Sequence, residues 1–286
     1  MDIQRLDHMV ILCPNIDEAI AHYQTLLGRA CSWQHSNEAD GTTSALFVLE
    51  NTSIELIAPN GDGPVGERVK ELLDGKPGLL SSLAFGVSDI HDAHYVARRR
   101  GLRPGDIEVL SASHKERERQ WARFRCDDQA LGGLKVFMFQ ERTAPLEVAE
   151  AGPGHAFRLD HLVVNTGNTE RALANYGARL GLRLALERIA EKWGIHYLFF
   201  RLSNLTFEVI KRLENPAPES AQDSLWGLTW EVDDLDEAHT RLSAAGVTIS
   251  DVRVGRKPGT RVMSVKSHDL GIPTLLLDNK AQPDVD

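Results

Sequence analysis

The sequence has little cysteine and no long hydrophobic run. Its 286 residues include three cysteines, Cys13, Cys31 and Cys126, and none of them belongs to a Cys-x-x-Cys pair. Such sparse cysteine argues against a zinc ribbon or a disulfide framework and is typical of a reducing compartment. No apolar run approaches the roughly 18 residues that a membrane-spanning helix requires, and the first residues lack the pattern of a secretory signal. We therefore expect a cytoplasmic protein with no membrane partner.

Basic residues are also in short supply. Lys and Arg number 32 against 41 Asp and Glu, which gives a formal net charge of −9. Because an acidic balance repels phosphate, we expect no nucleic-acid partner. Hydrophobic residues make up 42% of the chain, which is too many for long intrinsic disorder. A chain of this length predicts roughly two domains of about 150 residues.

The chain repeats itself. Leu6-Asp7-His8 recurs 153 residues later as Leu159-Asp160-His161, and one register without gaps holds for about 50 residues. Further matches at this offset include Tyr23 with Tyr176, Gly28 with Gly181, and Glu55 with Glu208. A fainter repeat, at an offset of 145 residues, aligns 87–90 with 232–235. The chain is therefore predicted to contain four modules in two tandem halves.

A segment rich in Pro and Gly separates the two halves. It contains Pro145, Gly152, Pro153 and Gly154, which are typical of a linker. We predict a first domain over residues 1–142, a linker over 143–156 and a second domain over 157–286. Each domain then holds two modules.

Every module shows the same order of expected elements. In the first, an apolar run at 8–13 predicts a strand, Asn15 is placed as a helix N-cap, and 16–27 has helical apolar spacing. Strand-like runs follow at 31–35, 44–49 and 53–58. The later modules predict helices at 90–100, 169–180 and 235–245. The pattern is β-α-β-β-β, an α+β fold in which two modules can curl their open sheet faces into one cup.

Four βαβββ modules with Leu-Asp-His openings resemble the vicinal oxygen chelate superfamily. That superfamily includes glyoxalase I, methylmalonyl-CoA epimerase, extradiol dioxygenases and bleomycin-resistance proteins. The motifs that carry the resemblance are LDHMVILCPNIDEAIAHYQTLLG with SIELIAPN, and LDHLVVNTGNTERALANYGARLG with LTFEVIKR. The resemblance implies two tandem glyoxalase-like halves, each a pair of modules forming a curved sheet cup. We expect modules one and two, and three and four, to pair, while the swapped pairing of one with four occurs among relatives.

The resemblance also implies a metal site in the cup, with ligands from the first and last strands of a module. On this sequence the ligands are His8 with Glu55 and His161 with Glu208, each pair 47 residues apart. Imidazole and carboxylate donors suit a divalent Mn, Fe, Ni, Co or Zn ion, and two protein ligands leave positions open for substrate oxygens. Glu55 and Glu208 are also the candidate catalytic residues, because a glutamate that faces a cup can move a proton. In the alternative interpretation, His8 and His161 are ancestral strand residues in a cup without metal.

The second and fourth modules lack ligands at the matching places. Those places hold poor metal ligands: Ser82, Phe137, Gly227 and Leu275. Weaker candidates for a third donor are Glu231, His196 and His268. Members of the superfamily that cleave aromatic rings need two His and one Glu, and usually take one His and the Glu from module four, which lacks both here.

Two classes of function follow from the resemblance. The first is a metal-dependent isomerase or lyase that acts on a small oxygenated metabolite, with extradiol ring cleavage as the enzymatic alternative. The second is a non-catalytic protein that sequesters a ligand, as bleomycin-resistance-like members do. A homodimer is compatible with the open sheet edges.

Several other arginine, tyrosine and aromatic residues could take part in function, but a structural role is the simpler interpretation for most of them. Arg123 and Arg125 alternate with Trp121, so they either form the polar face of a strand or clamp a carboxylate or phosphate. Tyr23 and Tyr176 are expected to pack within their modules. Aromatic residues of the second half are candidates for an apolar pocket, although core packing is their default role: Trp193, Phe199, Phe200, Trp226 and Trp230.

Overall fold

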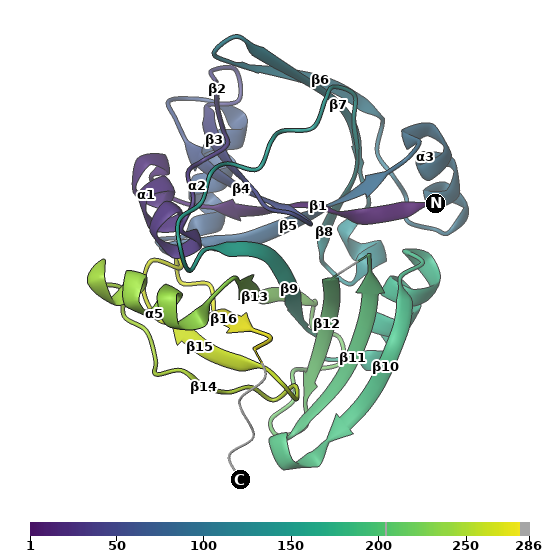
Figure 1. The fold of residues 1–286 in the computed structure, drawn as a ribbon. Coiled ribbons are helices and arrows are strands. Elements are labelled where there is room, and N and C mark those ends of the chain that lie inside the picture. The colour runs from purple at the N-terminus through teal and green to yellow at the C-terminus, as the bar shows by residue number, and fades with distance from the viewer. Residues whose placement is uncertain (204, 281–286) are drawn as a thin grey trace. The chain divides into compact units, whose positions relative to one another are not determined.

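A computed structural model describes residues 1–203 and 205–280. It contains two eight-stranded sheets with the same strand order (Figure 1). The first sheet runs β2-β3-β4-β1-β5-β8-β7-β6, and the second runs β10-β11-β12-β9-β13-β16-β15-β14. Each sheet joins four strands of one module to four strands of the next module. This confirms the predicted α+β fold with two tandem glyoxalase-like halves, and modules one and two share a sheet, as do modules three and four.

The strands of the first sheet are β1 (Ile3–Leu12), β2 (Trp33–Asn37), β3 (Thr42–Val48), β4 (Ser53–Pro59), β5 (Leu79–Val87), β6 (Glu108–His114), β7 (Arg117–Arg125) and β8 (Lys135–Glu141). Its helices are α1 (Ile16–Leu27), α2 (Pro64–Leu73), α3 (Ile90–Arg99) and the short 3₁₀ helix η1 (Asp128–Leu131). The predicted bounds of α1 are correct. The Asn15 side chain accepts from the N–H groups of Asp17 and Glu18, and Gly28 ends the helix at φ 68°.

The strands of the second sheet are β9 (Ala156–Asn165), β10 (Arg183–Ala190), β11 (Ile195–Leu202), β12 (Leu205–Arg212), β13 (Ser224–Val232), β14 (Arg253–Val254), β15 (Arg261–Val265) and β16 (Thr274–Asp278). Its helices are α4 (Thr169–Ala172), the π-helix η2 (Leu173–Arg179), the 3₁₀ turn η3 (Glu191–Trp193) and α5 (Leu235–Ala244). The helix predicted over 169–180 is present, but only its first four residues are α-helical. After Ala172 it widens into π geometry, and Gly177, a poor helix former, lies within the widened part.

Packing divides the chain into two compact units. Unit 1 contains Met1–Val10, Leu80–Pro145 and His161–Trp226. Within it, Nη1 of Arg100 donates to the carbonyl oxygens of Arg179 and Leu180, at 3.2 and 3.5 Å. A Cβ atom added at Gly181 would lie 2.8 Å from this guanidinium. Arg100 thus provides hydrogen bonds for carbonyl groups at the end of η2 that would otherwise lack them, and Gly181 leaves room for its guanidinium.

Unit 2 contains Ile11–Leu79, Leu146–Asp160 and the chain from Gly227 onward. Here Arg241 of α5 donates to the carbonyl oxygens of Thr25, Leu26 and Gly154. Its guanidinium lies beside Gly28, where an added Cβ would come within 2.9 Å. In each unit, therefore, an arginine fills the space next to the glycine that ends a helical segment, and it neutralises carbonyl groups there.

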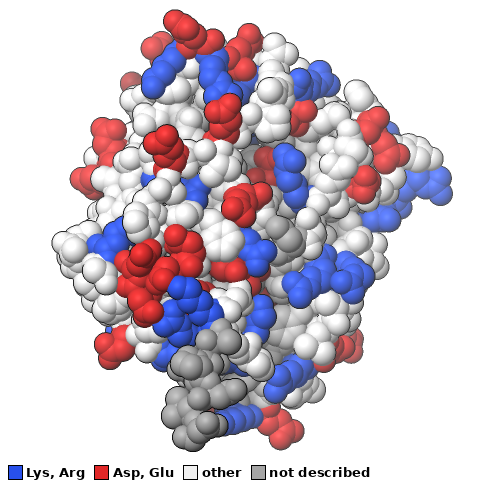
Figure 2. Space-filling model, in the orientation of Figure 1, with Lys and Arg blue, Asp and Glu red and all other residues white. Residues whose placement is uncertain are grey.

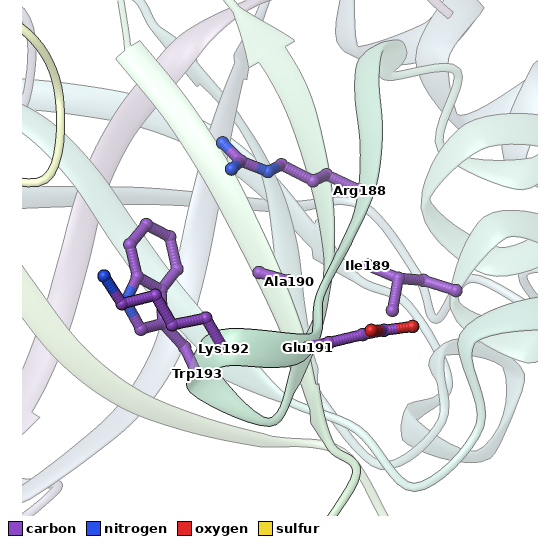
Figure 3. A pocket seen from close by; sticks show the side chains of 6 residues that line it. All are labelled: Arg188, Ile189, Ala190, Glu191, Lys192 and Trp193. Atoms are coloured by element: carbon purple, nitrogen blue, oxygen red, sulfur yellow. The ribbon is translucent and has the colours of Figure 1, made fainter.

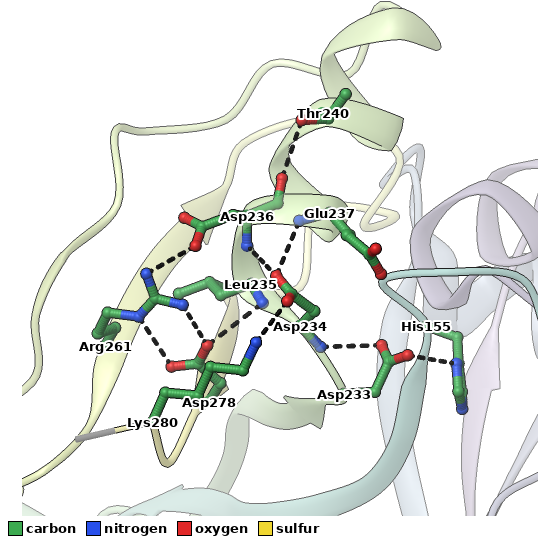
Figure 4. Close-up of polar contacts among 10 residues, drawn as sticks. All are labelled: His155, Asp233, Asp234, Leu235, Asp236, Glu237, Thr240, Arg261, Asp278 and Lys280. Atoms are coloured by element: carbon green, nitrogen blue, oxygen red, sulfur yellow. Dashed lines mark hydrogen bonds and ion pairs between the residues drawn. The ribbon is translucent and has the colours of Figure 1, made fainter. Parts of the chain in front are cut away.

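Ion pairs fix the last described strand of unit 2 to the start of α5. Arg261 donates to both carboxylate oxygens of the buried Asp278, at 3.1 and 2.5 Å, and to Asp236 at 2.9 Å (Figure 4). Asp234 caps α5 through the N–H groups of residues 236 and 237, and Lys280 donates to it. The bond to Lys280 and the capping N–H groups lower the pKa of Asp234 to about 2. This bidentate pair and the cap hold β16 against α5.

Charges of both signs are mixed on the surface. Figure 2 shows Lys and Arg interspersed with Asp and Glu over the face in view. Among residues 1–203 and 205–280, no helix combines the length and the apolar character needed to cross a bilayer.

Candidate functional site

His161 and Glu208 lie on adjacent parallel strands of unit 1. His161 of β9 is opposite Thr206 of β12, and Glu208 follows two residues later, on the same side of the sheet. Nε2 of His161 is 3.9 Å from Oε2 of Glu208, and the two side chains are 21% and 15% exposed. The sheet therefore brings together an imidazole and a carboxylate at a position that solvent can reach.

An aromatic wall continues from this pair across the same sheet face. Phe199 of β11 lies opposite Glu208, and Tyr197 lies opposite Ile210. The rings of Tyr197 and Phe199 stack with centroids 5.3 Å apart, and Trp193 meets Tyr197 edge-on at 6.4 Å. Tyr197 is buried, whereas Trp193 and Phe199 are partly exposed. An apolar surface thus borders the carboxylate, as a substrate-binding face requires.

His8 lies on β1 in a different environment. Its Nδ1 is 3.0 Å from Oδ1 of Asp7, and its ring meets Phe139 edge-on at 5.1 Å. Asp7 also accepts from Arg5 at 2.6 Å. Burial raises the pKa of Asp7, but the hydrogen bond and charge of His8 and the charge of Arg5 outweigh it, so the pKa is lowered overall. The Asp7 carboxylate therefore orients the imidazole through Nδ1.

Glu55 lies on β4, opposite Leu46 of β3. It is half-buried, whereas its neighbours Ile54 and Leu56 are fully buried on the other side of the strand. This alternation agrees with the orientation expected from the sequence. The roles of His8 and Glu55 as metal ligands remain predictions.

The three weaker candidates for a third donor have partners of their own. His196 is 2.8 Å from Glu187, and Glu231 forms an ion pair with Arg158 at 2.5 Å. The ring of His268 lies 4.6 Å from that of His22, and burial together with this neighbour lowers the pKa of His268. Among the described residues, no group of three or more His, Cys, Asp or Glu side chains is spaced to hold a metal ion. The His161–Glu208 pair is thus a two-residue donor set.

Comparison with protein families identifies this architecture. Residues 6–156 match the model of a glyoxalase-like domain, and residues 160–263 match that of the glyoxalase/bleomycin resistance protein/dioxygenase superfamily. The chain belongs to this superfamily. Both halves are therefore members of one superfamily, as the internal repeat indicates.

Curated relatives of this superfamily member include epimerases. It is 33% identical over 92 residues to the mitochondrial methylmalonyl-CoA epimerase of Dictyostelium discoideum, an alignment that covers 32% of this chain and 54% of that protein. It is 30% identical over 111 residues to an ethylmalonyl-CoA/methylmalonyl-CoA epimerase of Cereibacter sphaeroides, covering 38% of this chain and 77% of the relative. The chain thus spans about half the length of the first of these relatives.

Solved structures share the fold over almost the whole chain. A variant of 4-hydroxymandelate synthase from Streptomyces coelicolor superposes with a TM-score of 0.69 at 14% identity, covering 99% of this chain and 94% of that one. A Mn(II)-bound glyoxalase from Novosphingobium aromaticivorans superposes with a TM-score of 0.65 at 12% identity, covering 97% and 82%. At these identities the likeness is one of fold.

The His161–Glu208 pair fits part of a divalent metal site. Two donors that share one ion at about 2.1 Å lie roughly 3 Å apart. The observed separation of 3.9 Å exceeds this by about 1 Å, which side-chain rotation can close. Because both side chains are partly exposed, further positions around an ion remain open to water and substrate oxygens. The donor set suits an open site rather than a closed structural one.

The arginines of β7 support the structural interpretation. Arg123 donates to Glu108 at 2.9 Å, and Arg125 forms an ion pair with Asp128. Both guanidinium groups are exposed and lie on a solvated strand face. Each is already paired with a carboxylate.

Sequence reasoning missed a buried polar network in unit 1. The Asp223 carboxylate is fully buried and accepts from Thr166, Arg171 and Tyr176, at 2.7, 2.8 and 2.6 Å. Asp223 stands in a polar segment just before β13, where no periodic pattern distinguishes it from neighbouring polar residues. Only the fold reveals that these four residues meet.

Proposed function

We propose that this protein is a metal-dependent enzyme whose His161 and Glu208 hold a divalent cation and whose substrate is a small oxygenated metabolite. The observation that carries the proposal is that the two side chains lie 3.9 Å apart and are both partly exposed to solvent. A divalent cation bound there would polarise a carbonyl oxygen of the substrate. The reaction class that follows is isomerase or lyase chemistry.

The residues of this chain supply the remaining parts. Glu208 has two carboxylate oxygens, so one can face the cation while the other accepts a proton from the carbon next to the carbonyl group and returns it. The wall of Tyr197 and Phe199 excludes water from one side of Glu208, which strengthens electrostatic interactions with the substrate. Epimerases among the curated relatives support proton transfer over ring cleavage.

Metal analysis tests the proposal. The purified protein is reconstituted separately with Mn, Fe, Ni, Co and Zn, and the bound metal is measured by mass spectrometry. We expect near-stoichiometric metal in the wild type and in His8→Ala, and its loss in His161→Ala. Loss in His8→Ala alone would move the site to the first half. If no ion binds to any of the three proteins, the outcome favours the ligand-sequestering alternative.

Isotope exchange tests the reaction class. The metal-loaded protein is incubated in deuterated water with methylmalonyl-CoA, chosen because the curated relatives are epimerases. Deuterium is expected at the carbon between the two carbonyl groups, and Glu208→Gln should abolish its incorporation. Oxygen consumption with a catechol, and no exchange, would instead support the dioxygenase alternative.

A further inference from the structure

The hairpin between β10 and β11 forms a pocket whose residues take no part in the proposed proton transfer. It has a volume of about 290 Å³ and is lined by residues 188–193 (Figure 3). Two of these residues, Arg188 and Lys192, are exposed bases, and neither forms an ion pair with another described residue. This hairpin therefore carries positive charge that the rest of unit 1 does not neutralise.

The side chains of residues 188–193 extend to two opposite sides of the chain. Arg188, Lys192 and Trp193 extend to one side of the chain, whereas Ile189 and Glu191 extend to the other (Figure 3). The guanidinium of Arg188 lies over the Trp193 ring, 5.5 Å from its centroid. Because Glu191, the acid among residues 188–193, points away, one side presents two cations next to an aromatic ring.

This charged side is the side that carries Glu208. Arg188 lies opposite Tyr197, and Leu186, two residues earlier, lies opposite Phe199, which in turn lies opposite Glu208. Cross-strand partners share a sheet face. With strands about 4.8 Å apart and a rise of about 3.3 Å per residue, the backbones of Arg188 and Glu208 are roughly 12 Å apart. The aromatic wall of Trp193, Tyr197 and Phe199 spans that distance.

We propose that Arg188, Lys192 and Trp193 form a subsite for an oxyanion attached to a flat, unsaturated group. A planar guanidinium and an ammonium together suit a carboxylate or a phosphate, and the indole suits the adjoining flat group. The inference rests on the proposed function in one respect: the anion is the far end of a substrate whose oxygenated end reaches Glu208. The substrate class is thus an elongated organic anion with an unsaturated body.

Binding of small probes tests the subsite without any activity measurement. Calorimetric titrations use phenyl phosphate and benzoate as the two anions, inorganic phosphate as charge without a ring, and benzyl alcohol as a ring without charge. Either phenyl phosphate or benzoate should bind more tightly than both inorganic phosphate and benzyl alcohol. Added salt should lower the affinity for that anion. The tighter of the two identifies the anion as phosphate or carboxylate.

Matched variants decide whether the pocket is responsible. Arg188→Ala should lower the affinity for the tighter-binding anion by about 10-fold or more, because the variant loses one charged hydrogen bond. Arg183→Ala removes an exposed arginine from the same strand but outside the pocket, and should leave the affinity unchanged. Trp193→Phe should reduce the advantage of the anions that carry a ring over inorganic phosphate.

Three results would overturn the subsite. These are no saturable binding of either anion, equal weakening by Arg183→Ala and Arg188→Ala, or inorganic phosphate binding as tightly as phenyl phosphate. Glu208→Gln and metal-free protein should bind the probes as the wild type does. Failure of the metal site and failure of the subsite are therefore distinguishable.

Discussion

Tyr23 and Tyr176 occupy the same place in two copies of one module, yet their hydroxyl groups meet different surroundings. The Tyr176 hydroxyl donates to Asp223 at 2.6 Å. The Tyr23 hydroxyl is equally buried but has no hydrogen-bond partner among the described residues. Burial raises the pKa of both phenols, with a further contribution from Asp223 for Tyr176 and from Asp269 for Tyr23.

The surrounding residues explain the difference. At the repeat offsets, Cys13 stands where the other copy has Thr166, and Gly78 stands where it has Asp223. Gly78 precedes β5 as Asp223 precedes β13, but a Cβ added there would lie 2.6 Å from Leu270. The first copy therefore has no room for the carboxylate. The duplicated modules keep their apolar core and the tyrosine, and differ in the polar groups around it.

Removal of the carboxylate gives the largest expected change in stability. Asp223→Ala leaves Arg171 and the Tyr176 hydroxyl without their shared acceptor in a buried position. We expect a loss of about 3–5 kcal/mol in the free energy of unfolding, measured by urea denaturation. The control Asp106→Ala, at an exposed position of the same unit, should stay within about 0.5 kcal/mol of the wild type. A loss below 1 kcal/mol for Asp223→Ala would show that the network contributes little.

The two glutamates test whether the copies also differ in function. With the metal that binds best, Glu208→Ala should weaken affinity by roughly 100-fold, whereas Glu55→Ala should change it little. The reason is that Glu208 approaches His161 to 3.9 Å on the sheet face where we propose that the metal binds. A competition titration with a chromophoric chelator measures both constants. The opposite ranking would assign the metal to the first copy.

A matched pair of tyrosine variants sharpens the comparison. Tyr176→Phe removes a hydrogen bond to a buried carboxylate and should cost about 2 kcal/mol of stability. Tyr23→Phe removes a buried hydroxyl that lacks a partner among the described residues, so it should be neutral or stabilise by up to about 1 kcal/mol. Both free energies come from urea denaturation. Equal effects would mean that water satisfies Tyr23 in solution.

Helix caps and apolar spacing in the sequence predicted most elements of the fold. They predicted an element correctly where neighbouring residues alone determine it. Helix α1 lies at its predicted position because Asn15 caps it, apolar residues recur at helical spacing, and Gly28 ends it. Helix α2 was missed because its first residue, Pro64, completes a Gly-Asp-Gly-Pro stretch that is typical of a loop. The π geometry of η2 was also missed, since α- and π-turns share one apolar pattern over so short a stretch.

The candidate site was predictable only in part. The repeat and the family resemblance identified His161 and Glu208, and the strand register explains why they meet. The Asp223 network and the Arg188 hairpin depend on residues brought together by tertiary structure, for which the linear sequence holds no spacing rule. Alternation along β10 places Arg188 and Ile189 on opposite sides, but it does not reveal which side faces Glu208.

Cys13 provides a pH-dependent test of the same comparison. Burial raises the pKa of its thiol from 9.0 to about 12, so the native state keeps a proton that the unfolded chain loses. Above pH 9 the native state therefore binds more protons, and the free energy of unfolding falls by up to about 1.4 kcal/mol per pH unit until pH 12. Cys13→Thr, which installs the residue of the other copy, should remove this contribution from urea denaturation curves. Cys126, whose thiol pKa is also raised to about 12 by burial, should give the same flattening in Cys126→Ala. An unchanged slope in Cys13→Thr would mean that the thiol near Tyr23 reaches solvent in the native state.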